Sequence, residues 1–372
     1  MKFYASVFGG YDDNVNTNNG PKEGSSYVGG NVIADYTFGD PRLQIALNAG
    51  AGGVYYLDHV TGQDYNIDLK GALGVTYKSS PRLTLGTKLL LEYLTEPNFD
   101  NANGLNSRNG NYFYTDDDFF AEYLWSRRFS TKTSYKLEAY QYDNELVALY
   151  SDHFINLFAN EFRFQMVPTT LLVAEYRYGI VTYNNEGAVL VPAQLGQPAV
   201  LLENDSMTQY ILGGLDHVFN PRFTGSLRGG VELRSYDVGG DRTSPYFEAT
   251  LNYAVGRRTS VGWTGRYGLE EPETPGAQSR TTFRTGLRAK FDLTSRMSST
   301  LDVFYNHDDY HAASVTFIPF TEEAFDVGLG VRYAITSLIG VQASYHYTEV
   351  ISDMSFRDYS RNRFSAGVSL TF

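Results

Sequence analysis

The stretch Tyr65–Lys78, YNIDLKGALGVTYK, alternates between two kinds of side chain and decides the fold. Its odd positions are apolar or glycine, whereas most of its even positions are polar or small. Because successive side chains of a β-strand point to opposite faces, this stretch predicts a strand with one apolar and one polar face. The same alternation returns in Thr282–Leu293 and in Arg363–Phe372, while helical periodicity is hard to find. We therefore expect an all-β chain.

Tight and long breaks separate the predicted strands in alternation. Tight breaks such as Gly39–Arg42 and Ser79–Arg82 carry the Pro, Asp and Ser that favour turns, and they recur about every 40 residues. Longer polar breaks lie between them, and Thr95–Thr115 and Asn184–Asp205 are the longest. The pattern predicts about 18 strands. A propeller repeats at a similar spacing but needs four short strands per repeat, where this chain has two long ones.

The composition excludes several classes of protein. The chain has no cysteine, so thiolate metal sites, disulfides and cysteine nucleophiles are absent. Its 30 basic and 42 acidic residues give a net charge of −12, which argues against a nucleic-acid partner. No stretch approaches the roughly 20 apolar residues that a membrane helix requires. Yet 30 Tyr, 24 Phe and 36 Gly mark an aromatic- and glycine-rich chain.

The apolar phase of the strands carries aromatic residues near both strand ends, with mostly Leu, Val, Ala and Gly between them. Those near the tight turns are Phe38, Tyr77, Phe219, Tyr253, Tyr333 and Phe372, and those near the long loops are Tyr55, Tyr65, Tyr93, Phe119, Tyr267 and Tyr347. A large soluble sandwich would bury the apolar face but would not require this placement. Two aromatic belts at membrane interfaces would. We predict one domain, residues 1–372: a transmembrane antiparallel up-and-down β-barrel with short periplasmic turns and long extracellular loops.

The motif Phe8–Val15, FGGYDDNV, resembles the opening of a family of putative beta-barrel porins associated with exosortase and exopolysaccharide loci. The resemblance implies an outer-membrane barrel for secreted polysaccharide or another solute, without a catalytic motif. At the other end, Val368, Leu370 and Phe372 resemble the signature by which barrel-assembly machinery recognises outer-membrane proteins. No signal peptide precedes the first strand, so we take the chain as a mature protein. The expected location is the outer membrane of a Gram-negative bacterium, among lipids and lipopolysaccharide.

The polar phase predicts the lining of the lumen, and barrels of 16 to 18 strands leave an aqueous channel. Basic residues gather on the later strands, namely Arg228, Arg234, Arg266, Arg284, Arg288, Lys290, Arg332 and Arg363. Such residues select anions when they form rings, because guanidinium groups suit carboxylates and phosphates. Alternatively, they pair with acidic residues across neighbouring strands and stabilise the water-facing wall of the barrel. Tyrosines on the same phase, including Tyr56, Tyr140 and Tyr246, offer a stacking track for sugar rings.

We therefore predict a porin that passes polar, anionic solutes or secreted polysaccharide by passive diffusion, with the two longest loops folded inward. A general diffusion porin for small solutes is one alternative. A structural or adhesive barrel with a loop-plugged lumen is another, since Asn184–Asp205 contains two apolar runs. None of the six histidines lies in a nucleophile motif, so we expect no enzyme and no cofactor. His307 and His311 flank two aspartates, but their spacing would place them together only on a helix, and we assign no metal.

Overall fold

The computed structural model is a closed antiparallel β-barrel. It describes residues 1–99, 106–184, 188–191, 200–202, 204–256, 258–312 and 317–372. Within these residues, 18 strands form the barrel and two short strands form a separate hairpin. Each barrel strand pairs with its neighbours along the chain, and β20 closes the sheet against β1. The predicted fold and strand number are confirmed.

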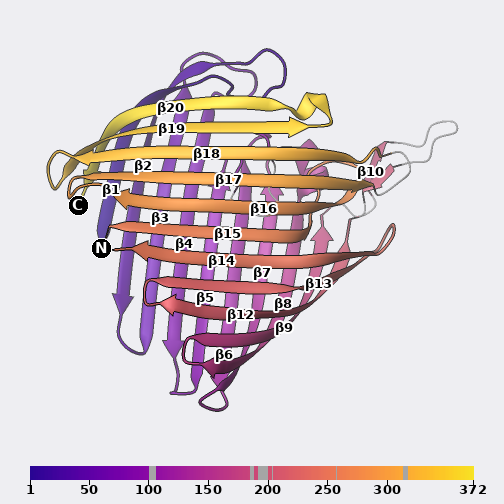
Figure 1. The fold of residues 1–372 in the computed structure, drawn as a ribbon. Coiled ribbons are helices and arrows are strands. Elements are labelled where there is room, and N and C mark those ends of the chain that lie inside the picture. The colour runs from indigo at the N-terminus through magenta and orange to yellow at the C-terminus, as the bar shows by residue number, and fades with distance from the viewer. Residues whose placement is uncertain (100–105, 185–187, 192–199, 203, 257, 313–316) are drawn as a thin grey trace.

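The strands alternate in direction around the barrel, and those of the carboxy-terminal half lie in front of those of the amino-terminal half in Figure 1. The barrel strands are β1 (Lys2–Asp12), β2 (Ser25–Gly39), β3 (Leu43–Tyr56), β4 (Tyr65–Lys78), β5 (Leu83–Leu94), β6 (Tyr112–Leu124), β7 (Phe129–Tyr142), β8 (His153–Val167), β9 (Thr170–Tyr183), β12 (Ser206–Asn220), β13 (Phe223–Tyr236), β14 (Arg242–Val255), β15 (Thr259–Glu270), β16 (Ala277–Asp292), β17 (Met297–Ala312), β18 (Phe320–Ala334), β19 (Ile339–Ser352) and β20 (Tyr359–Thr371).

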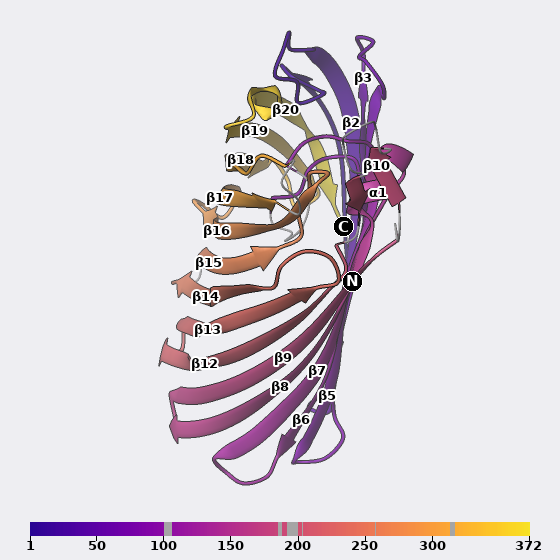
Figure 2. The same cartoon turned by 90° about the vertical axis from the view of Figure 1, so that its right-hand side faces the viewer.

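Side-chain oxygens set the tight turns. The Asp40 carboxylate accepts hydrogen bonds from the backbone N–H groups of Arg42 and Leu43, at 2.6 and 2.7 Å. The Ser80 hydroxyl accepts from the corresponding groups two and three residues on, and Thr336 repeats the arrangement. These local bonds are the reason that Asp, Ser and Thr mark the turns in the sequence. Both termini lie at this end of the barrel (Figure 1) and close together (Figure 2), where Phe3 and Phe372 exchange backbone hydrogen bonds of 3.1 and 2.9 Å.

The long connections at the other end contain small elements that the alternation did not predict. Helix α1 (Glu145–Ser151) begins where the Asn144 side chain accepts a hydrogen bond from the N–H of Leu146. A 3-10 turn, η1 (Ser355–Arg357), precedes β20. Strands β10 (Ala188–Val191) and β11 (Val200–Leu202) pair within the connection from β9 to β12. No helix in the described parts of the chain is long and apolar enough to cross a membrane.

The outward phase of the strands is apolar over most of the barrel, as the alternation predicts. The aromatic residues expected near the tight turns are all exposed, from 43% for Tyr77 to 64% for Phe372. Of those expected near the long loops, Phe119 is misplaced, because it pairs with Tyr135 in the middle of β6 and β7. The apolar exterior and the aromatic residues at its ends fit a barrel surrounded by lipid.

Candidate functional site

The connection between β5 and β6, residues 95–111, turns into the barrel. Near its start, the Glu96 carboxylate forms ion pairs with Arg361 and Arg363 on β20, at 2.5 and 3.1 Å. Phe99 then packs in a buried cluster with residues of β17, β18, β19 and β20, namely Phe304, Ala324, Val350 and Tyr359. In the closed sheet β17 and β18 lie about half-way round the barrel from β5 and β6, so Phe99 lies across the lumen from the strands that the connection joins. We call residues 95–111 the crossing loop; residues 100–105 of it lie outside the described residues.

Asn106 anchors the second part of the crossing loop. Its backbone N–H donates to Glu273 at 2.7 Å, and its side-chain amide donates to Glu322 at 2.9 Å. Its carbonyl accepts a hydrogen bond of 2.5 Å from the hydroxyl of Tyr359. From there the loop returns toward its own side, where the Arg108 guanidinium donates to Asn16 and Asn66. The predicted inward folding of this loop is therefore seen for its described residues.

The residues that surround Asn106 include several charged side chains. Oxygen atoms of Glu273, Asp308 and Glu322 lie within 4.8 Å of one another, close enough to share a metal ion. Two guanidinium groups already balance these carboxylates: Arg280, which is fully buried, lies 3.4 Å from Asp308, and Arg357 lies 2.6 Å from Glu322. We therefore interpret the three carboxylates as the anchor of the crossing loop and assign no metal to them.

Burial and neighbouring guanidinium groups have opposite effects on the pKa values of Glu96 and Glu273, two carboxylates in loops. Burial raises the pKa of Glu96, but the guanidinium groups of Arg361 and Arg363 outweigh it and hold the pKa at about 2. For Glu273, burial dominates over Arg280 and Arg357, so its pKa is raised above the usual range. Glu96 is thus ionised at any pH a bacterium meets, and its ion pairs hold the loop against β20.

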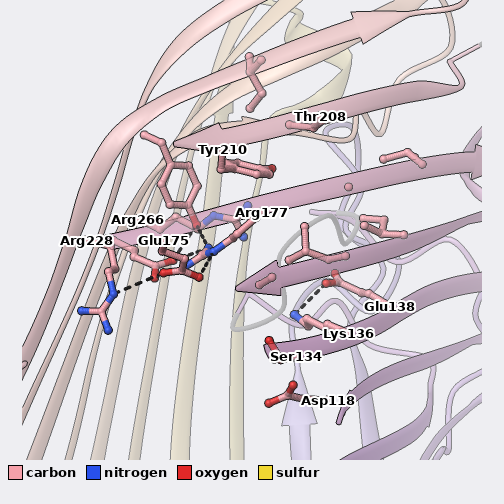
Figure 3. A pocket seen from close by; sticks show the side chains of 18 of the residues that line it. Asp118, Ser134, Lys136, Glu138, Glu175, Arg177, Thr208, Tyr210, Arg228 and Arg266 are labelled. Carbon is pink, nitrogen blue, oxygen red and sulfur yellow. Dashed lines mark hydrogen bonds and ion pairs between the residues drawn. The ribbon is translucent and has the colours of Figure 1, made fainter. Parts of the chain in front are cut away.

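A cavity of about 380 Å³ lies on the inward faces of β6–β9 and β12–β15 (Figure 3). Among the described residues that line it, six are basic (Lys132, Lys136, Arg177, Arg228, Arg234 and Arg266) and six are acidic (Asp118, Glu138, Glu161, Glu175, Glu248 and Glu271). Arg177 forms ion pairs of 2.6 Å with Glu175 and 2.7 Å with Glu248. Arg228 lies 2.7 Å from Asp216. The charges on this wall are therefore balanced.

A second cavity, of about 310 Å³, lies beside the crossing loop, between Glu96, Phe99 and strands β16–β20. Arg288 and Asp302 meet there at 3.6 Å, and both side chains are about half exposed. His346 contacts Asp326 at 2.6 Å on the same wall. Arg288 is thus more open to water than any of the basic groups that line the first cavity, whereas Arg361, which also lines the second cavity, is buried.

Tyrosines occupy another part of the interior. Tyr112, Tyr114, Tyr140 and Tyr142 pack against one another and against Val147 of α1, and all are at most 7% exposed. The ring centroids of Tyr114 and Tyr140 are 4.6 Å apart. Tyr140, one of the tyrosines predicted as a stacking track for sugar rings, is thus buried against protein in this cluster.

All eight basic residues predicted to line the lumen lie on the inward phase of their strands, but they form no single ring. Arg228, Arg234 and Arg266 line the first cavity, and Arg288 and Arg363 line the second. Arg284 lies between the cavities, where it donates to the carbonyl of Phe99 and to Glu270. Arg332 lies near the tight turns beside Ser369 and Thr371, and Lys290 is exposed in the row of Ser260 and Thr300. Whether these residues set selectivity stays a prediction.

The lumen also depends on residues that the sequence prediction passed over. Arg280 and Arg361 are buried and hold the carboxylates of Glu273, Asp12 and Glu96. Arg361 has the same phase as Arg363, so alternation was sufficient to find it. Arg108 and Asn106 lie in a loop, where alternation carries no information.

A closed sheet with an even number of antiparallel strands, an apolar exterior and a charged interior is typical of a transmembrane β-barrel of the outer-membrane type. Residues 195–372 match the family model described as putative beta-barrel porin 2. The match confirms the expected resemblance to putative beta-barrel porins, although the motif Phe8–Val15 lies outside the matched residues. It points to an outer-membrane channel rather than an enzyme.

No curated protein matches the chain. Among solved structures, OccAB4 of Acinetobacter baumannii is 14% identical, with a TM-score of 0.46 over 100% of this chain and 98% of that one. OccK2 (OpdF) of Pseudomonas aeruginosa, solved with glucuronate, is 11% identical with a TM-score of 0.48, again over 100% and 98%. A BenF-like porin of Pseudomonas fluorescens is 11% identical with a TM-score of 0.49 and the same coverage.

Proposed function

We propose that this protein is a passive outer-membrane channel for small polar solutes, with a preference for anions, in which the crossing loop sets the size limit. The observation that carries the proposal is the anchoring of the described residues of the loop, 95–99 and 106–111, across the lumen by Glu96, Phe99 and Asn106. A barrel of 18 strands would otherwise leave a wide aqueous channel. The cavity beside the loop, of about 310 Å³, and the cavity of about 380 Å³ on the wall formed by β6–β9 and β12–β15 are of the size of small-solute sites.

The anion preference rests on the less covered basic groups rather than on all of the inward arginines. Arg228 and Arg234 are at most 8% exposed and are paired with carboxylates, so they add little net potential to the lumen. Arg288 is 55% exposed, and Lys290, one inward position further along β16, is also exposed. Neighbouring cations that face water raise the local concentration of anions.

Planar-bilayer recording in a salt gradient tests the proposal. Replacing both cations, Arg288→Gln with Lys290→Gln, should move the reversal potential toward cation selectivity, also because the charge of Asp302 is then no longer offset by Arg288. The matched control is Arg222→Gln with Arg258→Gln, an equal loss of charge on exposed tight turns. An unchanged reversal potential in the first variant, or an equal shift in both, would contradict the assignment.

Passage of secreted polysaccharide is the second candidate, and the lining of the mouth favours it. A cavity of about 1030 Å³ at the long-loop end is lined mainly by side-chain amides and hydroxyls, with aromatic rings among them; the amides are Asn16, Asn18, Gln63, Asn106, Asn109, Asn111 and Asn144. Amides and rings suit sugar hydroxyls and sugar faces, but a polymer would pass only after the crossing loop leaves its anchors. In the same recordings, neutral oligosaccharides added on the long-loop side should then interrupt the current. A barrel without any conductance would favour the structural or adhesive alternative. That alternative rests on two apolar runs within Asn184–Asp205, of which residues 192 and 198–199 lie outside the described part of the chain.

A further inference from the structure

The outward surface of β6, β7 and β8 is polar in a region where the rest of the barrel is apolar. One row across these strands holds Asp117, Leu137 and Asn156, and the next holds Phe119, Tyr135 and Phe158. Thr133 and Asn160 form a further pair. Beyond β5, a comparable row across β2, β3 and β4 holds only Val32, Ala51 and Leu69. We call the group Asp117, Thr133, Tyr135, Asn156, Phe158 and Asn160 the polar patch.

The polar patch lies at membrane depth, and part of its hydrogen-bonding capacity is unused. Asp117 lies between Phe113 and Tyr123, the outward aromatic residues at the two ends of β6. One of its carboxylate oxygens is buried and has no hydrogen-bond partner among the described residues. An ionisable side chain facing hydrocarbon is costly, and such residues therefore mark contacts or pathways.

The same patch carries unused donors two strands away. The carbonyl oxygen of Asn156 accepts from the Tyr135 hydroxyl at 2.7 Å, and that of Asn160 accepts from Thr133 at 3.1 Å. These bonds orient the two side chains so that their amide nitrogens face elsewhere, and neither nitrogen donates a hydrogen bond within the described chain. The patch thus holds an acceptor on β6 and donors on β8, with β7 between them.

We propose that the polar patch is the interface between two copies of this chain in the membrane. A twofold axis along the membrane normal, passing in front of Leu137, places β6 of one copy against β8 of the other. The Asp117 carboxylate then meets the amide groups of Asn156 and Asn160 of the second copy, and the reciprocal contact forms at the same time. Such self-complementarity is what an isologous interface requires, and lipid tails at this depth offer no donors.

The aromatic side chains beside the polar groups fit the same role. Phe119 and Phe158 are 45% and 49% exposed, and Tyr135 lies between them with ring centroids 6.3 and 5.0 Å away. Large aromatic residues are enriched at protein–protein interfaces. Here they form a row in the middle of the strands, away from the membrane–water boundary where belt aromatics lie.

The absence of cysteine makes a crosslinking experiment direct. Asp117→Cys with Asn156→Cys should give a reducible disulfide-linked dimer when outer membranes are oxidised. Within one chain these positions are two strands apart, about 10 Å, which is too far for a disulfide. The matched control is Val32→Cys with Leu69→Cys, two positions with the same spacing in the apolar row of β2, β3 and β4. A dimer only in the first variant supports the proposal.

A second pair of variants keeps the polar groups intact. Leu137→Cys lies on the proposed axis, so it should form a disulfide with the same cysteine of the second copy. Ala51→Cys should form no such disulfide. Each variant is first shown to be folded by its heat-dependent mobility in SDS gels, and native mass measurement of the unmodified protein should give twice 41.7 kDa. Folded variants without a dimer band, equal bands in test and control, or crosslinking to a protein of another mass would overturn the proposal.

Discussion

Replacing Glu96 with glutamine tests how firmly the crossing loop is held. The Glu96 carboxylate pairs with Arg361 at 2.5 Å and with Arg363 at 3.1 Å, and its pKa is lowered from 4.5 to about 2. That lowering corresponds to a net preference of roughly 3 kcal/mol for the charged carboxylate in the folded protein, after burial has opposed the guanidinium groups. Glutamine keeps the size of the side chain and a carbonyl that accepts from Asn66, but it removes the charge.

The loss shifts the balance between anchored and released loop by about two powers of ten toward release. We expect Glu96→Gln to show a larger mean conductance at pH 7 and more open-channel noise in single-channel recordings. The wild-type channel should approach this behaviour only in acid. Because the pKa of Glu96 is lower in the folded protein, its contribution is complete above pH 4.5 and is lost as the pH falls toward 2.

The control is Glu145→Gln, an exposed residue in the first turn of α1. It removes the same charge without touching the loop and should leave the conductance unchanged. If Glu96→Gln matches the wild type in conductance, noise and pH dependence, Glu96 does not hold the loop across the lumen, and the reasoning from its ion pairs is refuted.

Two further predictions concern the closing strand. We expect the barrel-assembly machinery to recognise Phe372. Deletion of Phe372 should therefore lower the folded fraction in outer membranes several-fold in a heat-mobility assay, whereas the control Phe356→Ala, in an exposed loop, should not. Equal folded yields of the two variants would contradict recognition of Phe372. At the seam between β1 and β20, a Cβ atom on Gly10 would lie 2.0 Å from the carbonyl oxygen of Phe364, but on Gly9 its nearest neighbour would be 3.5 Å away. Gly10→Ala should therefore lower the melting temperature clearly more than Gly9→Ala, and similar values for the two would contradict the tight packing of the seam.

The strands were predictable because their signal is local. In Tyr65–Lys78 the polarity of each side chain indicates which face of the strand it occupies. The tight turns carry Asp40 or Ser80, whose side-chain oxygens accept hydrogen bonds from backbone groups only two or three residues away. The same alternation placed Arg228 and Arg363 on the inward phase. It also places Asp117 on the outward phase of β6, although nothing in that stretch alone shows that Asn156 lies two strands away.

The partners of the charged groups were not predictable from the chain alone. Net charge and strand phase left open whether the inward arginines select anions or pair with acids. Arg177 on β9 meets Glu248 on β14 although β12 and β13 lie between these strands, because the sheet curves into a barrel and both side chains point into its interior. Glu96 meets Arg361 because the barrel closes, which brings a loop after β5 against the last strand.

The sequence by itself thus determined an antiparallel barrel, its strand number, its two faces and the pool of lumen residues, because alternation with a period of two is a property of neighbouring residues. Tertiary structure alone decided which charges are balanced, which remain open to water, and where the crossing loop is anchored. Those outcomes depend on contacts between residues up to several hundred positions apart, and strand register and barrel closure set such contacts.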